Sequence, residues 1–136
     1  MAQHEAAHVV VGCVMGLRFR KATVSREWDP IERDFIGGAT YFDGRYGTHL
    51  AWEIMGAAGI AWSKIAGCPW QWHRYDLKEL KRSVRTERGR RAVIRTAAVL
   101  LQGLSREHTK VTRALMERDI TGKDLAAIAR GEAIDD

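Results

Sequence analysis

The sequence is poor in cysteine, which argues against a small secreted protein held together by disulfides. Its two cysteines, Cys13 and Cys68, are too few and too far apart to form a framework of cross-links. Cys13 stands among apolar residues of a predicted helix, where we expect it to be a small core residue. This use of cysteine favours a reducing compartment, so we expect a cytoplasmic protein.

Long apolar runs, internal repeats and low-complexity tracts are also absent. No stretch reaches the roughly 18 apolar residues that a membrane-spanning helix requires. Near the N-terminus, His4 and Glu5 interrupt the apolar core that a signal peptide would need. We therefore expect no membrane partner for this chain.

What the sequence does contain is the composition of a single globular domain. Of its residues, 46% are hydrophobic and 29% are charged, values typical of a folded protein. A length of 136 residues suits one domain with a core of its own, so we expect residues 1–136 to fold together. The net charge of +5 favours acidic partners in general but does not by itself select nucleic acid.

Periodicity and capping residues predict an α+β protein that is predominantly helical. We expect a first helix packed on a small two- to three-stranded sheet, followed by a helical bundle. Trp28-Asp29-Pro30 is expected to interrupt the strands, and Asp76 to cap the helix that starts at residue 77 and bends near Gly89. The expected helices cover residues 2–15, 49–66, 77–104 and 105–118 with a short capped one after Thr121, and the expected strands cover residues 18–26 and 37–42.

The most informative segment is His4-Glu5-Ala6-Ala7-His8, an H-E-x-x-H pattern. On a helix, the two histidines lie one turn apart on the same face and can bind a single zinc ion. Glu5 then stands beside the ion as the base that takes a proton from the attacking water. The surrounding residues are mostly apolar and predict a buried helix, in which two histidines and a glutamate need a specific reason.

A catalytic zinc site needs a third protein ligand and an open position. Spacing alone does not choose among the remaining histidines, carboxylates and thiols. The candidates are His49, Glu53, Cys68, His73, Asp76 and His108.

Several segments together resemble the FtsH-like family, the ATP-dependent membrane zinc proteases. His4–Val11 is similar to the zinc helix of that family, and Lys21–Val24 is similar to the first strand after it. Gly37–Thr40 resembles the second strand, which lines the substrate cleft. A helix of small residues ending at Gly67 follows in both, and then Tyr75-Asp76-Leu77 resembles the Asn-Asp-Leu of the family.

The resemblance implies that Asp76 is the third zinc ligand, with His4 and His8 as the other two. It also implies a metallopeptidase that acts on peptides or unfolded proteins, with Glu5 as the catalytic residue. The chain departs from the family at Ala7, where a glycine is usual, and at Tyr75, which replaces the asparagine. Because 136 residues do not accommodate an ATPase domain and a membrane segment, the expected hydrolysis is independent of ATP.

A second interpretation starts from the basic stretch at residues 78–95, which suits a solvated helix face or a phosphate-binding surface. In this alternative, the chain is a non-catalytic helical module that binds protein or nucleic acid and carries a structural or vestigial zinc site. We favour the solvated face, and with it the peptidase. The basic residues are Lys78, Lys81, Arg82, Arg85, Arg88, Arg90, Arg91 and Arg95, against Glu79 and Glu87.

Overall fold

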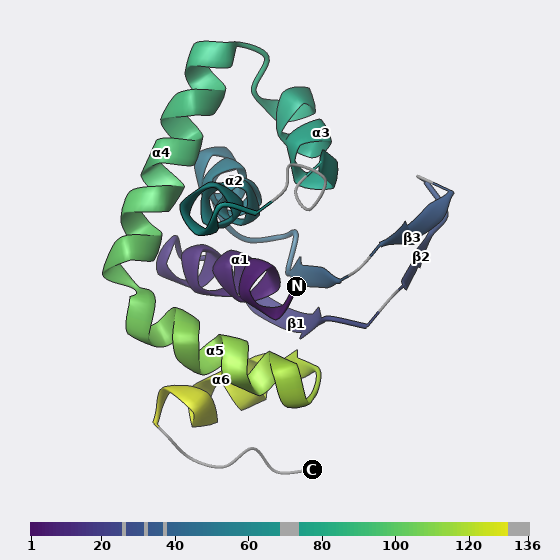
Figure 1. Ribbon diagram of the computed structural model, residues 1–136, viewed down its shortest axis with the longest axis vertical. Helices are drawn as coiled ribbons and strands as arrows, with labels where there is room; N and C mark the ends of the chain where they lie inside the picture. The colour runs from purple at the N-terminus through teal and green to yellow at the C-terminus, as the bar shows by residue number, and fades with distance from the viewer. Residues whose placement is uncertain (26, 32, 37, 69–73, 131–136) are drawn as a thin grey trace.

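The computed structural model describes residues 1–25, 27–31, 33–36, 38–68 and 74–130. The predicted class is confirmed, because this part of the chain is mostly helical with a small antiparallel sheet (Figure 1). The helices are α1 (Ala2–Val14), α2 (His49–Ala66), α3 (Arg74–Ser83), α4 (Glu87–Gly103), α5 (Ser105–Glu117) and α6 (Gly122–Ala129).

The main sheet has three antiparallel strands in the order β4 (Ala39–Phe42), β1 (Phe19–Thr23), β5 (Ile120–Thr121). In the central strand, Ala22 pairs with Thr40 on one side and with Ile120 on the other. Strand β5 was not predicted, because two residues are too short to show an alternating pattern. It nevertheless joins the C-terminal part of the chain to the strand that follows α1.

A separate hairpin of β2 (Glu27–Asp29) and β3 (Asp34–Ile36) extends away from the helices (Figure 1). The predicted interruption at Trp28-Asp29-Pro30 is therefore misplaced, since β2 continues to Asp29 and Pro30 lies in the turn. A proline has no N–H for a ladder but is well suited to the turn after β2. The strand predicted over residues 18–26 ends earlier, at Thr23.

Helix α1 forms the centre of the molecule and packs against α2, α5 and the main sheet (Figure 1). Every residue from His4 to Gly12 is buried, as expected of a helix that is apolar on all sides. Gly12 allows the sheet to approach, because a Cβ there would lie 2.2 Å from the ring of Phe42. The histidines and the glutamate of the motif are thus placed on the most enclosed helix of the fold.

Local capping explains most of the helix bounds. Helix α2 has the predicted bounds, with the Thr48 side chain accepting a hydrogen bond from the Ala51 N–H and with Gly67 left-handed at φ 70°. The predicted capping box of Thr121 and Asp124 is also confirmed at the start of α6.

The basic segment differs from its prediction in two places. Asp76 does not cap a helix that starts at residue 77, because it lies inside the first described turn of α3, which includes Arg74. The break between α3 and α4 is at residues 84–86 and not near Gly89. The reason is Thr86, whose side chain accepts a hydrogen bond from the Gly89 N–H and so begins α4 earlier than the glycine suggested.

Among the described residues, none of the helices has both the length and the apolar character needed to cross a bilayer.

The contact between α1 and the sheet gives a direct test of this packing. We expect Gly12→Ala to lower the free energy of unfolding by about 1–3 kcal/mol, because the added methyl displaces the ring of Phe42. Gly103→Ala is the matched control, since a Cβ at that helical position meets nothing within 4 Å. Urea titration of both variants measures the difference, and equal midpoints would contradict the proposed packing.

Candidate metal centre

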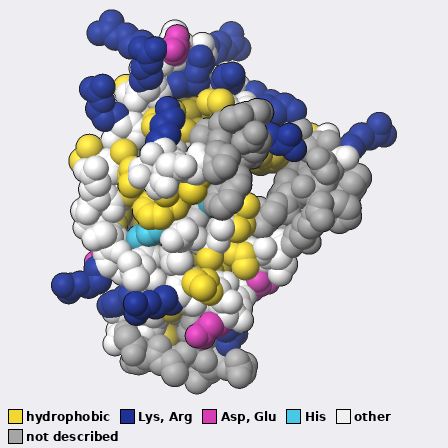
Figure 2. All heavy atoms as spheres, in the orientation of Figure 1, with side chains coloured by type: hydrophobic (Ala, Val, Ile, Leu, Met, Phe, Trp, Pro, Cys, Tyr) yellow, Lys and Arg dark blue, Asp and Glu magenta, His cyan; other side chains and the backbone are white. Residues whose placement is uncertain are grey.

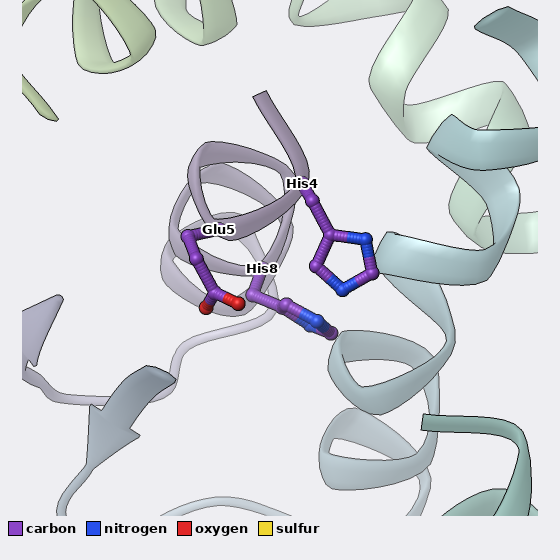
Figure 3. Close-up of side chains that lie close together, drawn as sticks. All are labelled: His4, Glu5 and His8. Carbon is purple, nitrogen blue, oxygen red and sulfur yellow. The ribbon is translucent and has the colours of Figure 1, made fainter. Parts of the chain in front are cut away.

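His4, Glu5 and His8 project from one side of α1, near its N-terminus (Figure 3). The two histidines are one helical turn apart, with ring centroids 5.1 Å from each other and side chains almost fully buried. Both rings point toward α2, whereas the carboxylate of Glu5 lies on the flank nearer the sheet (Figure 3). The imidazoles and the carboxylate thus face different neighbours, while their ligand atoms stay within 4.8 Å of one another.

Asp76 reaches the two histidines from α3. Its Oδ2 atom lies 2.6 Å from Nε2 of His4 and 3.0 Å from Nε2 of His8. Among the candidate ligands that the structure describes, this is the residue that contacts both imidazoles. Its side chain keeps 18% exposure, so the group of three is open on one side and enclosed elsewhere.

The hydrogen bond on the far side of His8 shows why this group requires a positive charge. Nδ1 of His8 donates to the backbone carbonyl of Met55 at 2.8 Å. In the neutral ring, Nε2 then presents a lone pair to the Asp76 carboxylate, and two lone pairs at 3.0 Å repel. A proton or a metal ion between them removes the repulsion.

The pKa values show how strongly the metal-free site holds a proton. Burial alone would lower the pKa of His8, but the charge of Asp76 and the hydrogen bond to it raise the pKa to about 9. Burial opposes ionisation of Asp76 too, yet the two imidazoles hold the pKa of its carboxyl well below the usual range. A buried carboxylate facing two imidazoles thus favours a bound proton or another cation between them.

Three features of the site fit zinc. Two imidazole nitrogens and one carboxylate oxygen form a donor set that zinc commonly takes. Nδ1 of His4 is buried and has no hydrogen-bond partner in the described part of the chain. The ring of His4 therefore contacts a polar partner through Nε2, the nitrogen that faces Asp76. Ligand atoms of a tetrahedral zinc lie about 3.3 Å apart, so the contacts of 2.6 and 3.0 Å need only a small opening.

Gly59 on α2 makes room for this group. A Cβ at Gly59 would lie 2.5 Å from Oδ2 of Asp76 and 2.5 Å from Nε2 of His4. No side chain fits there, so α2 approaches the ligands through bare backbone. Its place in a run of small residues does not show from the sequence what this glycine faces.

Strand β4 holds Glu5 on the flank of the site that faces the sheet. Its Oε2 atom accepts a hydrogen bond of 2.6 Å from the hydroxyl of Thr40. A ligand atom of Glu5 also lies within 4.8 Å of those of His4 and His8, so a second possible set of three exists. Asp76 is much closer to both imidazoles, which makes it the better third ligand.

A cleft of about 540 Å³ opens directly onto the site. One wall is strand β4 with Gly38 before it, and the other walls come from α2 and α3. Glu5, His8 and Asp76 all line this cleft, so a molecule bound in it reaches both the candidate ligands and the candidate base.

The other candidate ligands that the structure describes make different contacts. Glu53 and the exposed His49 both line the cleft, but they pair with each other at 2.8 Å, one turn apart on α2. His108 donates from Nε2 to the backbone carbonyl of Gln3, and its ring stacks on Trp62. Cys68 follows the end of α2 and belongs to none of the clusters of possible metal ligands among the described residues. His73 lies outside the described residues.

The basic residues form an exposed surface over α3 and the first turns of α4 (Figure 2). Parts of this surface are neutralised within single helices, since Arg82 pairs with Glu79 and Arg91 pairs with Glu87. Arg90 donates instead to the carbonyl of Val84 and so supports the break between the helices. These pairings are typical of a solvated face.

A scan of the chain against models of known protein families finds no match, and a search of curated proteins finds none either. The functional argument therefore depends on the arrangement of the residues.

Sequence reasoning missed two residues that shape this site. The hydroxyl of Thr40 belongs to a predicted strand, but nothing in the local pattern shows that it faces Glu5, because that contact joins residues 35 positions apart. Gly59 lies in a run of small residues on α2, and nothing in the local sequence distinguishes it from Gly56, where a Cβ would meet nothing within 4 Å.

These two glycines of α2 give a matched pair of variants. We expect Gly59→Ala to weaken zinc binding by at least about tenfold, because its methyl occupies the space beside His4 and Asp76. Gly56→Ala has room for its methyl and should bind zinc as the parent does. Competition titrations with a chromophoric chelator measure both affinities, and equal affinities would contradict the assigned position of the site.

Zinc binding should also weaken as the pH falls. Below about pH 9, His8 of the metal-free protein carries a proton that zinc must displace, because its pKa is raised to about 9. The apparent Kd is therefore expected to rise about tenfold for each pH unit between about pH 8 and about pH 6. Chelator competition in matched buffers measures this slope, and a Kd that does not change with pH would contradict the assignment of His8.

Proposed function

We propose that this chain is a zinc-dependent metallopeptidase. The observation that carries the proposal is the contact of the Asp76 carboxylate with both histidines of the H-E-x-x-H pattern, at 2.6 and 3.0 Å. Three protein ligands with one open side are typical of catalytic zinc, whereas structural zinc is closed by four. In this proposal His4, His8 and Asp76 hold the ion, and Glu5 is the catalytic residue.

When bound, zinc would supply Lewis-acid chemistry that polarises a carbonyl and makes a water easier to deprotonate. Glu5 lines the cleft close to the two imidazoles, where its carboxylate can accept a proton from the attacking water. The same carboxyl then returns the proton to the departing amine, so that the base is restored at the end of each cycle.

The cleft suits an extended polypeptide substrate. Strand β4 lies at the edge of the main sheet, and its residues from Ala39 to Tyr41 line the cleft together with Gly38. A peptide can pair with an edge strand through backbone hydrogen bonds, which depend little on its sequence. We therefore propose peptides and unfolded proteins as substrates, with hydrolysis that does not require ATP.

The proposal agrees with the resemblance of the chain to the peptidase domain of the FtsH-like family. Asp76 lies in the segment that resembles Asn-Asp-Leu, and the helix, strand and small-residue helix occur in the order described above. We place the protein in the cytoplasm on the basis of its cysteine use.

One observation favours a second function, a binding module for nucleic acid or acidic protein. Residues 74–95 contain nine Lys or Arg and three Asp or Glu, a net charge of +6 that exceeds the +5 of the whole chain. Such segregation of charge attracts polyanions. We rank it second, because Arg82 and Arg91 already pair with glutamates on their own helices, and Arg90 donates to the carbonyl of Val84.

The decisive experiment compares the parent with Glu5→Gln. Glutamine keeps the shape of the side chain but does not accept the proton, so we expect zinc at about one per chain and at least a hundredfold loss of casein hydrolysis. Metal analysis and a fluorescent casein assay, with and without a chelator, give the two readouts. Undiminished cleavage by Glu5→Gln would contradict the mechanism, and a zinc-loaded but inactive parent would support the binding module.

A further inference from the structure

The hydroxyl of Thr40 makes the shortest hydrogen bond to Glu5 in the described structure. Its Oγ1 lies 2.6 Å from Oε2 of Glu5 and 3.3 Å from the backbone carbonyl of the same residue. The hydroxyl has one proton to donate, and the much shorter distance shows that it donates to the carboxylate. Since Thr40 pairs with Ala22 in the main sheet, the donor stands on a fixed strand and not on a loop.

Gly38 restrains the same side chain from a second direction. A Cβ at Gly38 would lie 3.1 Å from Cγ of Glu5 and 3.0 Å from the carbonyl oxygen of Thr23. The backbone at this point therefore lies against the methylene stem of the glutamate. The stem and one carboxylate oxygen are both fixed by the segment that precedes and begins β4.

This restraint bears on which of two roles Glu5 takes. Its ligand atom is within 4.8 Å of those of His4 and His8, so a modest rotation would bring the carboxylate onto a shared metal ion. A hydrogen bond to Thr40 opposes that rotation, because it ties Oε2, and with it the carboxylate group, to strand β4. The restraint keeps one metal position open for substrate and water.

We propose that Thr40 is a positioning residue that holds Glu5 beside the metal ligands as a base and keeps it from becoming a ligand. The inference rests on the proposed peptidase function and deepens it. The side chain of Thr40 does not bind the metal in this proposal, and its hydroxyl acts through Glu5.

The kinetic test uses Thr40→Val, which keeps the shape and removes the donor, and Thr40→Ser, which keeps the donor. We expect Thr40→Val to lower kcat for casein peptides about tenfold or more while KM stays within about twofold, and Thr40→Ser to stay within about threefold of the parent. Thr23→Val is the matched control, because it removes a buried hydroxyl of β1 that interacts with the Ser25 N–H and not with Glu5.

A purely structural role for Thr40 predicts a different result. In that case Thr40→Val would lower the thermal midpoint but leave kcat of the folded fraction unchanged, as Thr23→Val is expected to do. Unchanged kcat in Thr40→Val, or an equal loss in Thr40→Ser, would overturn the proposal.

A spectroscopic test separates this inference from the proposed activity. If the parent cleaves no peptide, the peptidase proposal fails, and the cobalt(II)-substituted proteins then decide about Thr40. We expect Thr40→Val to show weaker visible absorption than the parent, because Glu5 joins the ligands and raises the coordination number. Adding Glu5→Gln should restore the parent spectrum, and identical spectra for parent and Thr40→Val would overturn the positioning role.

Discussion

The contact of one aspartate with two buried imidazoles is the interaction on which the arrangement of this protein depends. Asp76 comes from α3, and His4 and His8 come from α1, so the contact joins residues about 70 positions apart. Two imidazoles and a carboxylate in an enclosed region are costly unless a positive charge is shared among them. The raised pKa of His8 reflects that requirement, because the proton on His8 supplies the positive charge. A bound divalent ion would supply it as well.

The surrounding fold holds this group through contacts that orient the ligands. The carbonyl of Met55 fixes the ring of His8 from α2, and the absence of a side chain at Gly59 lets that helix come close. On the opposite side, His108 donates to the carbonyl of Gln3, and burial lowers its pKa, so the neutral donor persists at neutral pH. The N-terminal turn of α1 is thus supported by both α2 and α5, which explains how a motif so near the start of the helix is buried.

The sequence predicts local features of this protein better than contacts between distant segments. The helical class, the bounds of α2 and the pair of histidines follow from periodicity, caps and the four-residue spacing, which are all local. Strand β5 and the true break before α4 escaped prediction, because one depends on pairing with β1 and the other on a single threonine cap. Spacing left the third ligand open, and Asp76 was selected by resemblance alone, since no local rule brings α3 to α1.

Two carboxylates, those of Glu5 and Asp76, face the same cleft, and their different hydrogen-bond partners suit them to different roles. Asp76 faces two imidazoles that can carry positive charge, so it belongs to the cation site. Glu5 is adjacent in sequence to the proposed ligand His4 but faces a neutral hydroxyl on β4, which orients one oxygen without supplying a charge. A carboxylate oriented in this way is suited to accept and return a proton. Strand β4, which is proposed to bind the peptide, therefore also orients the proposed base Glu5. This shared strand couples the position of the substrate to proton transfer.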